Sequence, residues 1–306
     1  MDFYLNLLEL NKSKKEVLFY HSFPYIGLGS MISRIMVGLN LSVVNNFDFS
    51  YDTNDQYCID KYFEPKFKKE KTGYTKIIQW DFMKDSWESP TRNQQIYPMC
   101  PLEPWTFLSK DQWNAILAYC VCGSPTPQLE LLNQEFKMRV NWNSYDIHIG
   151  MHIRCGDKTD QNPYIPIEIY ILYLNLLVNL PIHKDKSIAV YLTSDDESVY
   201  HKVKQELLNK NLSSIDILWD EKELRYNNCN GAMVRDNPVL LDQETATGCK
   251  CISLLGDCKY VIGMSSSQFT WLGGLVSAFK QNLNTHNILM IDPFTYQLGH
   301  WGKVFM

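Results

Sequence analysis

The sequence predicts an α/β protein built around a doubly wound parallel sheet. In the second half of the chain, apolar runs of strand length alternate with stretches whose apolar residues recur every three or four positions, as in βαβ units. Polar clusters follow three of the predicted strands, at residues 152–158, 194–196 and 265–268. Because the carboxyl ends of parallel strands meet at one edge of a sheet, we expect these clusters to face one crevice.

The bulk composition sets the broad class of the protein. The 306 residues are enough for two domains of ordinary size. A formal net charge of −5 disfavours a general nucleic-acid binder, which carries a basic face. No apolar run approaches the roughly 18 residues of a membrane span. The first residues show no basic region before an apolar run, so no signal peptide is expected.

The cysteines indicate a reducing compartment. There are nine, an odd number, and none of them forms a C-x-x-C pair. Their spacing lacks the pattern of a zinc site. We expect reduced thiols in a cytoplasmic protein, with a few disulfides left open as the alternative.

The first predicted unit is a strand, a glycine turn and a helix. Residues 17–22 read as an apolar strand, and helical spacing of apolar residues begins at Met31. Gly27 and Gly29 allow the backbone to approach a ligand or its own strand, and Ser30 is expected to cap the helix. A tight turn in any α/β unit is the alternative, because a third glycine of the dinucleotide fingerprint is missing.

The rest of the first half is less regular. Residues 41–47 are predicted to form a short strand, and residues 48–110 to form loops and short elements, because their periodicity is weak. Ser109 introduces a helix at 113–122, and a second helix is expected over 125–140.

The second half begins near residue 141 with a clearer alternation. A polar stretch at 220–237 is expected to be a mobile loop. The predicted strands are 146–153, 187–193, 215–219, 260–264 and 288–291, and the predicted helices are 166–179, 197–209, 239–256 and 269–280.

The first polar cluster brings His152, Arg154 and Lys158 to the end of a buried strand. An arginine at this place can hold a phosphate through two parallel charge-assisted hydrogen bonds. Asp160 is a candidate general base if the turn holds it at the crevice. The alternative is a solvated charged turn with an exposed carboxylate.

The other two clusters also allow two interpretations. Asp195 and Asp196 can hydrogen-bond a ribose or a base, or they can cap the next helix and interact with its dipole. Ser266, Ser267 and Gln268 open a predicted helix, where hydroxyl and N–H groups suit a diphosphate but can also serve as a cap. The aspartate pair lacks the pattern of a cation loop.

Four motifs resemble the α-1,6-fucosyltransferase family and occur in the family's order. Residues 152–158 (HIRCGDK) are similar to its His-x-Arg-Arg-x-Asp-Lys motif, and residues 166–170 (PIEIY) follow at nearly the family's distance. Residues 191–196 (YLTSDD) resemble the second motif and residues 266–268 (SSQ) the third. The glycine turn at residues 27–29 is similar to the start of these catalytic domains. Both this turn and residues 258–266 also resemble the α-1,2-fucosyltransferases.

The resemblance implies a GT-B-type glycosyltransferase with two Rossmann-like domains. An acceptor-side domain would cover residues 1–140, and a nucleotide-sugar-binding domain residues 141–306. The implied reaction is the metal-independent, inverting transfer of a sugar, typically fucose from GDP-fucose, to a glycan hydroxyl. It implies no cofactor besides the donor substrate. The partners would be a nucleotide sugar and a glycan acceptor, with no nucleic acid and no membrane segment.

The resemblance also implies roles for individual residues. Arg154 would stabilise the departing diphosphate, Lys158 matches the family's lysine, and Asp160 is nearest to the family's acidic candidate for the base. The residues expected to hold the nucleotide sugar are His152, Arg154, Asp195, Asp196, Asp242, Ser266, Ser267 and Gln268, and those of a loop beside donor and acceptor are Tyr25, Gly27 and Gly29.

Two departures from the family leave alternatives open. Cys155 stands where the family has a second arginine, and the family's nucleotide-recognising aspartate falls near Cys251, with Asp242 as a shifted substitute. Transfer of another sugar, such as xylose from UDP-xylose, is therefore an alternative. So is a non-catalytic sugar-binding protein derived from such an enzyme. A zinc-dependent hydrolase is a third option, against which the cysteine spacing argues.

Overall fold

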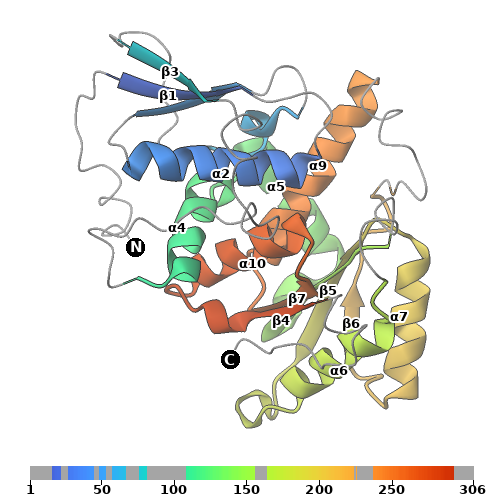
Figure 1. The fold of residues 1–306 in the computed structure, drawn as a ribbon. Helices are drawn as coiled ribbons and strands as arrows, with labels where there is room; N and C mark the ends of the chain where they lie inside the picture. The colour runs from blue at the N-terminus through green and yellow to red at the C-terminus, as the bar shows by residue number, and fades with distance from the viewer. Residues whose placement is uncertain are drawn as a thin grey trace.

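The described residues form two separate parallel sheets (Figure 1). The computed structural model describes residues 16–21, 27–44, 48–52, 57–66, 76–80, 108–155, 164–223, 225 and 237–292. The smaller sheet has the strand order β2-β1-β3, and the larger has the order β6-β5-β4-β7-β8. The predicted α/β class with a parallel sheet is therefore confirmed.

In the first half of the chain, the part that the structure describes forms the smaller sheet and three longer helices. The strands are β1 (Glu16–His21), β2 (Asp48–Asp52) and β3 (Lys76–Trp80). The helices are α2 (Leu28–Val44), α4 (Lys110–Cys122) and α5 (Pro127–Arg139), with a short 3₁₀ turn η1 (Ile59–Lys61).

Helix α2 is longer at both ends than the sequence predicted. It begins at Leu28, where the carbonyl of Gly27 accepts a hydrogen bond of 3.0 Å from the N–H of Met31. Ser30 therefore lies inside the first turn, and the prediction that it caps the helix is wrong. Helix α2 continues to Val44, so the strand predicted at 41–47 is also wrong, and the next strand is β2.

The reason for the second error lies in tertiary contacts. A short apolar run does not distinguish a strand from a buried helical turn. In the helical conformation, Leu39 is buried in the core, and the buried Asn40 accepts a hydrogen bond of 2.8 Å from the indole of Trp113 on α4. Burial of an amide is stabilising only with such a partner, and that partner lies 73 residues away in the sequence.

The caps of α4 and α5 follow local sequence rules. Ser109 and Gln112 form a reciprocal capping box at the start of α4, with hydrogen bonds of 3.2 and 2.9 Å. Thr126 caps α5, and Pro127 occupies its first position, where the missing N–H costs nothing. Both predicted helices are confirmed.

The second half forms the larger sheet, and its predicted elements are confirmed with ends shifted by at most one residue. The strands are β4 (Ile147–Ile153), β5 (Ile188–Ser194), β6 (Asp216–Leu218), β7 (Tyr260–Met264) and β8 (Ile288–Ile291). The helices are α6 (Ile167–Val178), α7 (Ser198–Asn209), α9 (Pro238–Leu255) and α10 (Gln268–Lys280). Most of the loop expected at 220–237 lies outside the described residues.

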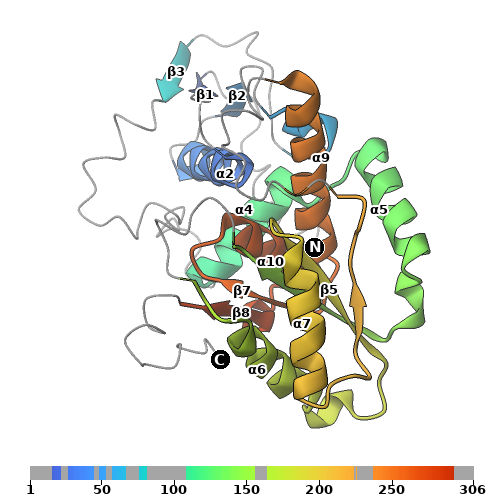
Figure 2. The same cartoon turned by 90° about the vertical axis from the view of Figure 1, so that its right-hand side faces the viewer.

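The elements stack in layers (Figure 2). Helices α6 and α7 cover one face of the larger sheet, and α5, α9 and α10 cover the other. Above these lie α2 and α4, and the smaller sheet lies beyond α2. Among the described helices, none combines the length and apolar character needed to cross a bilayer.

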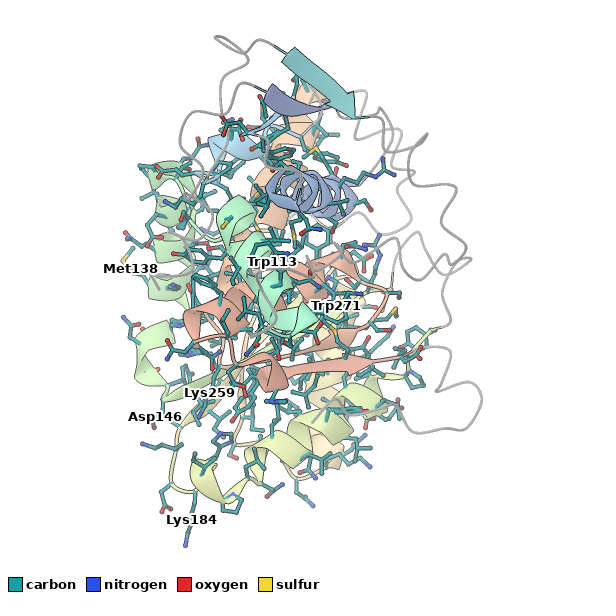
Figure 3. The ribbon with its side chains drawn as sticks, turned by 60° about the vertical axis from the view of Figure 1, so that its left-hand side comes forward. Trp113, Met138, Asp146, Lys184, Lys259 and Trp271 are labelled. Carbon is teal, nitrogen blue, oxygen red and sulfur yellow. The ribbon has the colours of Figure 1, made fainter. Side chains whose placement is uncertain are left out.

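One apolar core joins elements from both halves of the chain. Trp113 of α4 is fully buried, and Trp271 of α10 packs at the edge of the same cluster, in the middle of the molecule (Figure 3). The cluster also contains Ile35 of α2 and Phe279 of α10. The domain boundary expected near residue 140 stays a prediction.

Candidate functional site

The candidate site lies at the carboxyl edge of the larger sheet. From β4 the chain builds outwards to β5 and β6, and then returns to add β7 and β8 on the other side of β4. The strand order therefore reverses between β4 and β7, and open α/β sheets bind ligands in the crevice at such a switch point. His152, near the end of β4, pairs in register with Thr193 of β5 and Gly263 of β7. The three predicted polar clusters thus follow three adjacent strands.

His152 is a buried, neutral imidazole at this edge. Its Nδ1 lies 3.1 Å from Ser267 Oγ and 3.0 Å from Thr270 Oγ1, and its ring lies 5.9 Å from that of Phe269. Burial, and secondarily the positive charge of Arg154, lowers the pKa of His152 to about 3. The imidazole can therefore hydrogen-bond at neutral pH without carrying charge.

The start of α10 lies beside His152, at the carboxyl edge of the larger sheet. Ser267 is the N-cap residue of α10, but its side chain does not cap the helix, since it bonds His152. The Oγ of Ser266 is buried and has no hydrogen-bond partner among the described residues. The first N–H groups of a helix have no partner within the helix and attract anions. This helix start can hold an anionic group.

Gln268 makes a contact that the sequence did not predict. Its Oε1 accepts a hydrogen bond of 2.5 Å from Ser33 Oγ on α2. Gln268 therefore ties the candidate site to the first half of the chain, and its expected contact with a nucleotide stays a prediction.

Arg154 and Asp195 face each other across the ends of β4 and β5. The Nε of Arg154 lies 3.9 Å from Asp195 Oδ2, and both side chains are partly exposed, at 25% and 29%. Asp195 Oδ1 also accepts a hydrogen bond of 2.8 Å from the N–H of Cys155. The carboxylate thus holds the backbone that follows β4 and lies beside the partly exposed side chain of Arg154.

Two neighbouring side chains have structural roles. Asp196 Oδ1 accepts a hydrogen bond of 2.8 Å from the N–H of Ser198, the first residue of α7, as in the capping interpretation. Cys155 packs against the core beneath α6, and burial together with Asp195 and Asp196 raises its pKa to about 12. The thiol is therefore protonated and does not replace an arginine electrostatically.

The glycine turn lies next to the start of α10. A Cβ added to Gly29 would lie 2.8 Å from the Cβ of Gln268 and 3.4 Å from the ring of Phe269. A Cβ added to Gly27 would meet no atom within 4 Å. Gly29 is therefore needed for close packing of α2 on α10, and the expected place of both glycines in a loop beside donor and acceptor stays a prediction. Tyr25, the third residue expected in this loop, lies outside the described residues.

The structure brings Cys251, rather than Asp242, to the strand ends. Thr193 Oγ1 at the end of β5 donates to Cys251 Sγ at 3.5 Å. Asp242 is nine positions earlier on α9, which is about 13 Å along the helix axis. There its carboxylate pairs with Lys61 Nζ at 2.6 Å and accepts from Tyr62 Oη at 2.9 Å. The hydrogen bond from Lys61 lowers the pKa of Asp242. Its expected role in nucleotide binding stays a prediction.

Lys158 and Asp160, the other two predicted catalytic residues, lie outside the described residues, and their roles stay predictions. Residues that sequence reasoning missed are Thr193, Phe269 and Thr270. The signal for Thr270 was available, because it lies one helical turn after Ser267 and so shares its face.

The described part of the chain shows no group of three or more His, Cys, Asp or Glu side chains placed to hold a metal ion. Its cysteines, at positions 58, 120, 122, 155, 249, 251 and 258, are free thiols. Burial raises the pKa of Cys251 to about 12. The buried thiols are packing groups.

The strand order and its switch point define a doubly wound α/β protein. Two solved fucosyltransferase structures share the fold. One is a mutant of FUT1 from Arabidopsis thaliana in complex with GDP, with a TM-score of 0.54 and 13% identity, covering 95% of this chain and 73% of that one. The other is fucosyltransferase NodZ from Bradyrhizobium, with a TM-score of 0.52 and 10% identity, covering 95% and 97%.

The fold that the motif resemblance implied, that of a fucosyltransferase, is confirmed by these two structures. A scan of the sequence against known protein families finds no match. A search of curated proteins also finds none.

Proposed function

We propose that this protein is a glycosyltransferase that moves fucose from GDP-fucose to a glycan hydroxyl. The proposal rests on the position of Arg154 at the switch-point edge of the larger sheet. The start of α10 lies at the same edge, directly after the neighbouring strand β7. The fold is shared with a FUT1 structure in complex with GDP. Departure of a nucleoside diphosphate develops negative charge, which a fixed guanidinium and a helix N-terminus stabilise.

The proposed roles of the residues follow from this charge. Arg154 grips the diphosphate with its planar fork of donors, and Ser266 supplies a hydroxyl that has no other described partner. His152 orients Ser267 without adding charge. Lys158 adds a second cation, and Asp160 takes the proton of the acceptor hydroxyl.

The proposed reaction is a single displacement with inversion at the sugar carbon, and it requires neither a metal ion nor another cofactor. Arginine and the helix dipole supply the positive charge that a metal would otherwise bring. The glycan acceptor and a cytoplasmic location are also part of the proposal.

The donor sugar is the least constrained element of the proposal. Cys251 lies where the resemblance expects an aspartate, and its thiol contacts Thr193. Transfer of xylose from UDP-xylose is therefore the second candidate. A non-catalytic sugar-binding protein is the third, since Cys155 replaces a cation.

The test combines donor hydrolysis with calorimetry of GDP and UDP binding, on the wild type and on Arg154→Ala, with and without EDTA. We expect GDP binding and slow GDP-fucose hydrolysis that persist in EDTA and are lost in the variant. GDP binding without turnover would favour the non-catalytic candidate. A clear preference for UDP would overturn the fucose donor and leave the glycosyltransferase class in place.

A further inference from the structure

Exposed apolar side chains of the described residues gather around helix α6. Leu172 and Leu176 lie on the helix, Leu180 and Ile182 lie on the turn that follows it, and Tyr164 lies shortly before it. The other described helices that expose large apolar side chains, α5, α7 and α9, have one or two each. Single exposed apolar residues are ordinary, whereas a cluster of them marks an interaction surface.

Helix α6 is apolar on both of its faces. Tyr170, Leu174 and Leu177 are buried in the core beneath it. Leu172 and Leu176 lie four positions apart and therefore share the opposite face, where Leu176 is 55% exposed. A helix in an outer layer, as α6 is in Figure 2, normally has a single apolar stripe, which faces the core. The second stripe of α6 therefore needs a covering partner.

The charges at the two ends of this outer face have opposite signs. Glu168 is exposed in the first turn of α6. Lys184 is exposed just beyond the turn that follows the helix, and it points away from the molecule (Figure 3). Along the sequence the pattern is symmetric about Leu176. Leu172 and Leu180 each lie four positions from it, and the two charged residues each lie eight positions from it. The face is therefore complementary to a reversed copy of itself.

We propose that this face of α6 is the interface of a homodimer, in which α6 packs antiparallel against α6 of a second copy of the chain. A two-fold interface is isologous, so each contact between two different residues occurs twice. With the axis beside Leu176, this residue packs on its own copy, and Leu172 packs on Leu180 of the partner subunit. Glu168 then faces Lys184 of the partner subunit. The inference goes beyond the proposed function and does not depend on it.

A second copy fits this face better than a lipid surface does. Helices that lie in a membrane interface carry Lys and Arg on their polar side, which attract anionic lipids. Helix α6 contains neither Lys nor Arg, and Glu168 is its one charged residue. An anionic bilayer would repel this carboxylate, whereas the reversed copy brings a lysine to it. Antiparallel packing also places the positive end of each helix dipole beside the negative end of the other.

The test is analytical ultracentrifugation of the full chain. One helix pair is a small interface, so we expect a dissociation constant in the micromolar range. The wild type should pass from monomer to dimer between about 1 and about 200 µM. Leu176→Asp places two carboxylates against each other at the axis and should weaken the dimer at least about 10-fold.

Leu131→Asp is the matched control for Leu176→Asp. Leu131 is 56% exposed and lies on α5, which covers the other face of the larger sheet. The substitution is the same and the exposure of the replaced side chain is nearly equal. Leu131→Asp should therefore dimerise like the wild type.

A charge exchange tests the register of the interface. Glu168→Lys and Lys184→Glu each place like charges opposite one another, and each should weaken the dimer about 3- to 10-fold. Mixed in equal amounts, the two variants should form a heterodimer about as tight as the wild-type dimer, because each lysine then faces a glutamate again. Only contacts between chains can be repaired by mixing. A role of these charges within one chain would leave the mixture as weak as its components and would overturn the inference.

Three other results would also overturn the inference. One is a wild type that stays monomeric at about 200 µM. Another is a dimer that Leu176→Asp leaves unchanged, or that Leu131→Asp weakens as much. The third is binding of a monomeric wild type to phosphatidylserine vesicles that is lost in Leu176→Asp, which would assign the face to a lipid surface.

Two further measurements separate the interface from general damage. Circular dichroism melting identifies variants that fail to fold, and if Leu176→Asp is one of them, the mixing experiment decides. GDP binding should be equal in all of these proteins, because α6 exposes this face away from the candidate site. A wild type that binds no GDP but dimerises as described would overturn the proposed function and support the inference.

Discussion

His152 on β4 and Ser267 at the start of α10 are joined by a contact of 3.1 Å, although 115 residues separate them in the sequence. The contact spans the point where the strand order reverses. It orients a hydroxyl that would otherwise cap its own helix, and it leaves the first N–H groups of α10 open. The imidazole of His152 is neutral in this contact, because burial lowers its pKa.

The buried neutral state of His152 predicts a pH dependence of stability. The pKa is about 3 in the native state and about 6.5 in an unfolded chain. Between these values only the unfolded state binds the proton, so the free energy of unfolding falls as pH drops below 6.5, by about 1.4 kcal/mol per unit. Urea unfolding between pH 7 and pH 5 should show this slope in the wild type and a smaller one in His152→Gln. His201→Gln, on the exposed side of α7, is the control, and equal slopes in all three proteins would contradict the prediction.

The close packing of α2 on α10 predicts that Gly29→Ala is destabilising. The new Cβ would lie 2.8 Å from the Cβ of Gln268, an atom that cannot move without its backbone. Overpacking of this kind costs about 1–3 kcal/mol. Gly27→Ala is the matched control, because its Cβ meets no atom within 4 Å. Chemical denaturation should separate the two variants, and equal stabilities would show that the helices can shift apart freely.

The two lysine–aspartate pairs predict contrasting effects of lysine removal. Lys250→Met leaves Asp220 and Glu223 buried beside a neutral side chain, and breaking a buried pair costs about 3–5 kcal/mol. Lys61→Met removes the partner of Asp242, but both of those side chains are more than 40% exposed, and such pairs contribute about 0–1 kcal/mol. Thermal unfolding of the two variants measures the difference. A loss in Lys61→Met as large as in Lys250→Met would contradict this account.

The proposed role of Arg154 predicts that a lysine cannot replace it. Lys keeps the charge but cannot make the bidentate fork, and loss of one preorganised donor to a transition state costs about 10²–10³ in rate. Steady-state kinetics with GDP-fucose should show a fall of about 100-fold in kcat for Arg154→Lys with an unchanged melting temperature. Rates within a few-fold of the wild type would remove Arg154 from the mechanism.

Most strands and helices of the larger sheet could be predicted, because each is specified by residues that are close together in the sequence. Each strand from β4 to β8 is a short apolar run bounded by polar residues, and the capping box at Ser109 needs only residues three positions apart. The positions of the polar clusters at residues 152–158, 194–196 and 265–268 could be predicted from where the apolar strand patterns end. Their convergence at one edge then follows from a parallel sheet.

The errors fall where distant contacts outweigh local pattern. The run at 41–47 is compatible with a strand or a helix, and the hydrogen bond between Asn40 and Trp113 selects the helix. For Asp242 the sequence offered no sign of its partner in the first half of the chain, and its expected role beside a nucleotide stays a prediction. Its pair with Lys61, 181 residues away, has no signature in the sequence.

The order of residues along the chain was sufficient to specify the class of fold, the edge of the sheet that carries the polar groups and the guanidinium on which the proposal depends. These follow from periodicity and from the short reach of caps and turns. The partners of His152 and the buried pair of Lys250 and Asp220 arise only when segments more than 25 residues apart meet. Nothing in the local spacing of side chains encodes such meetings, because they depend on how the layers pack.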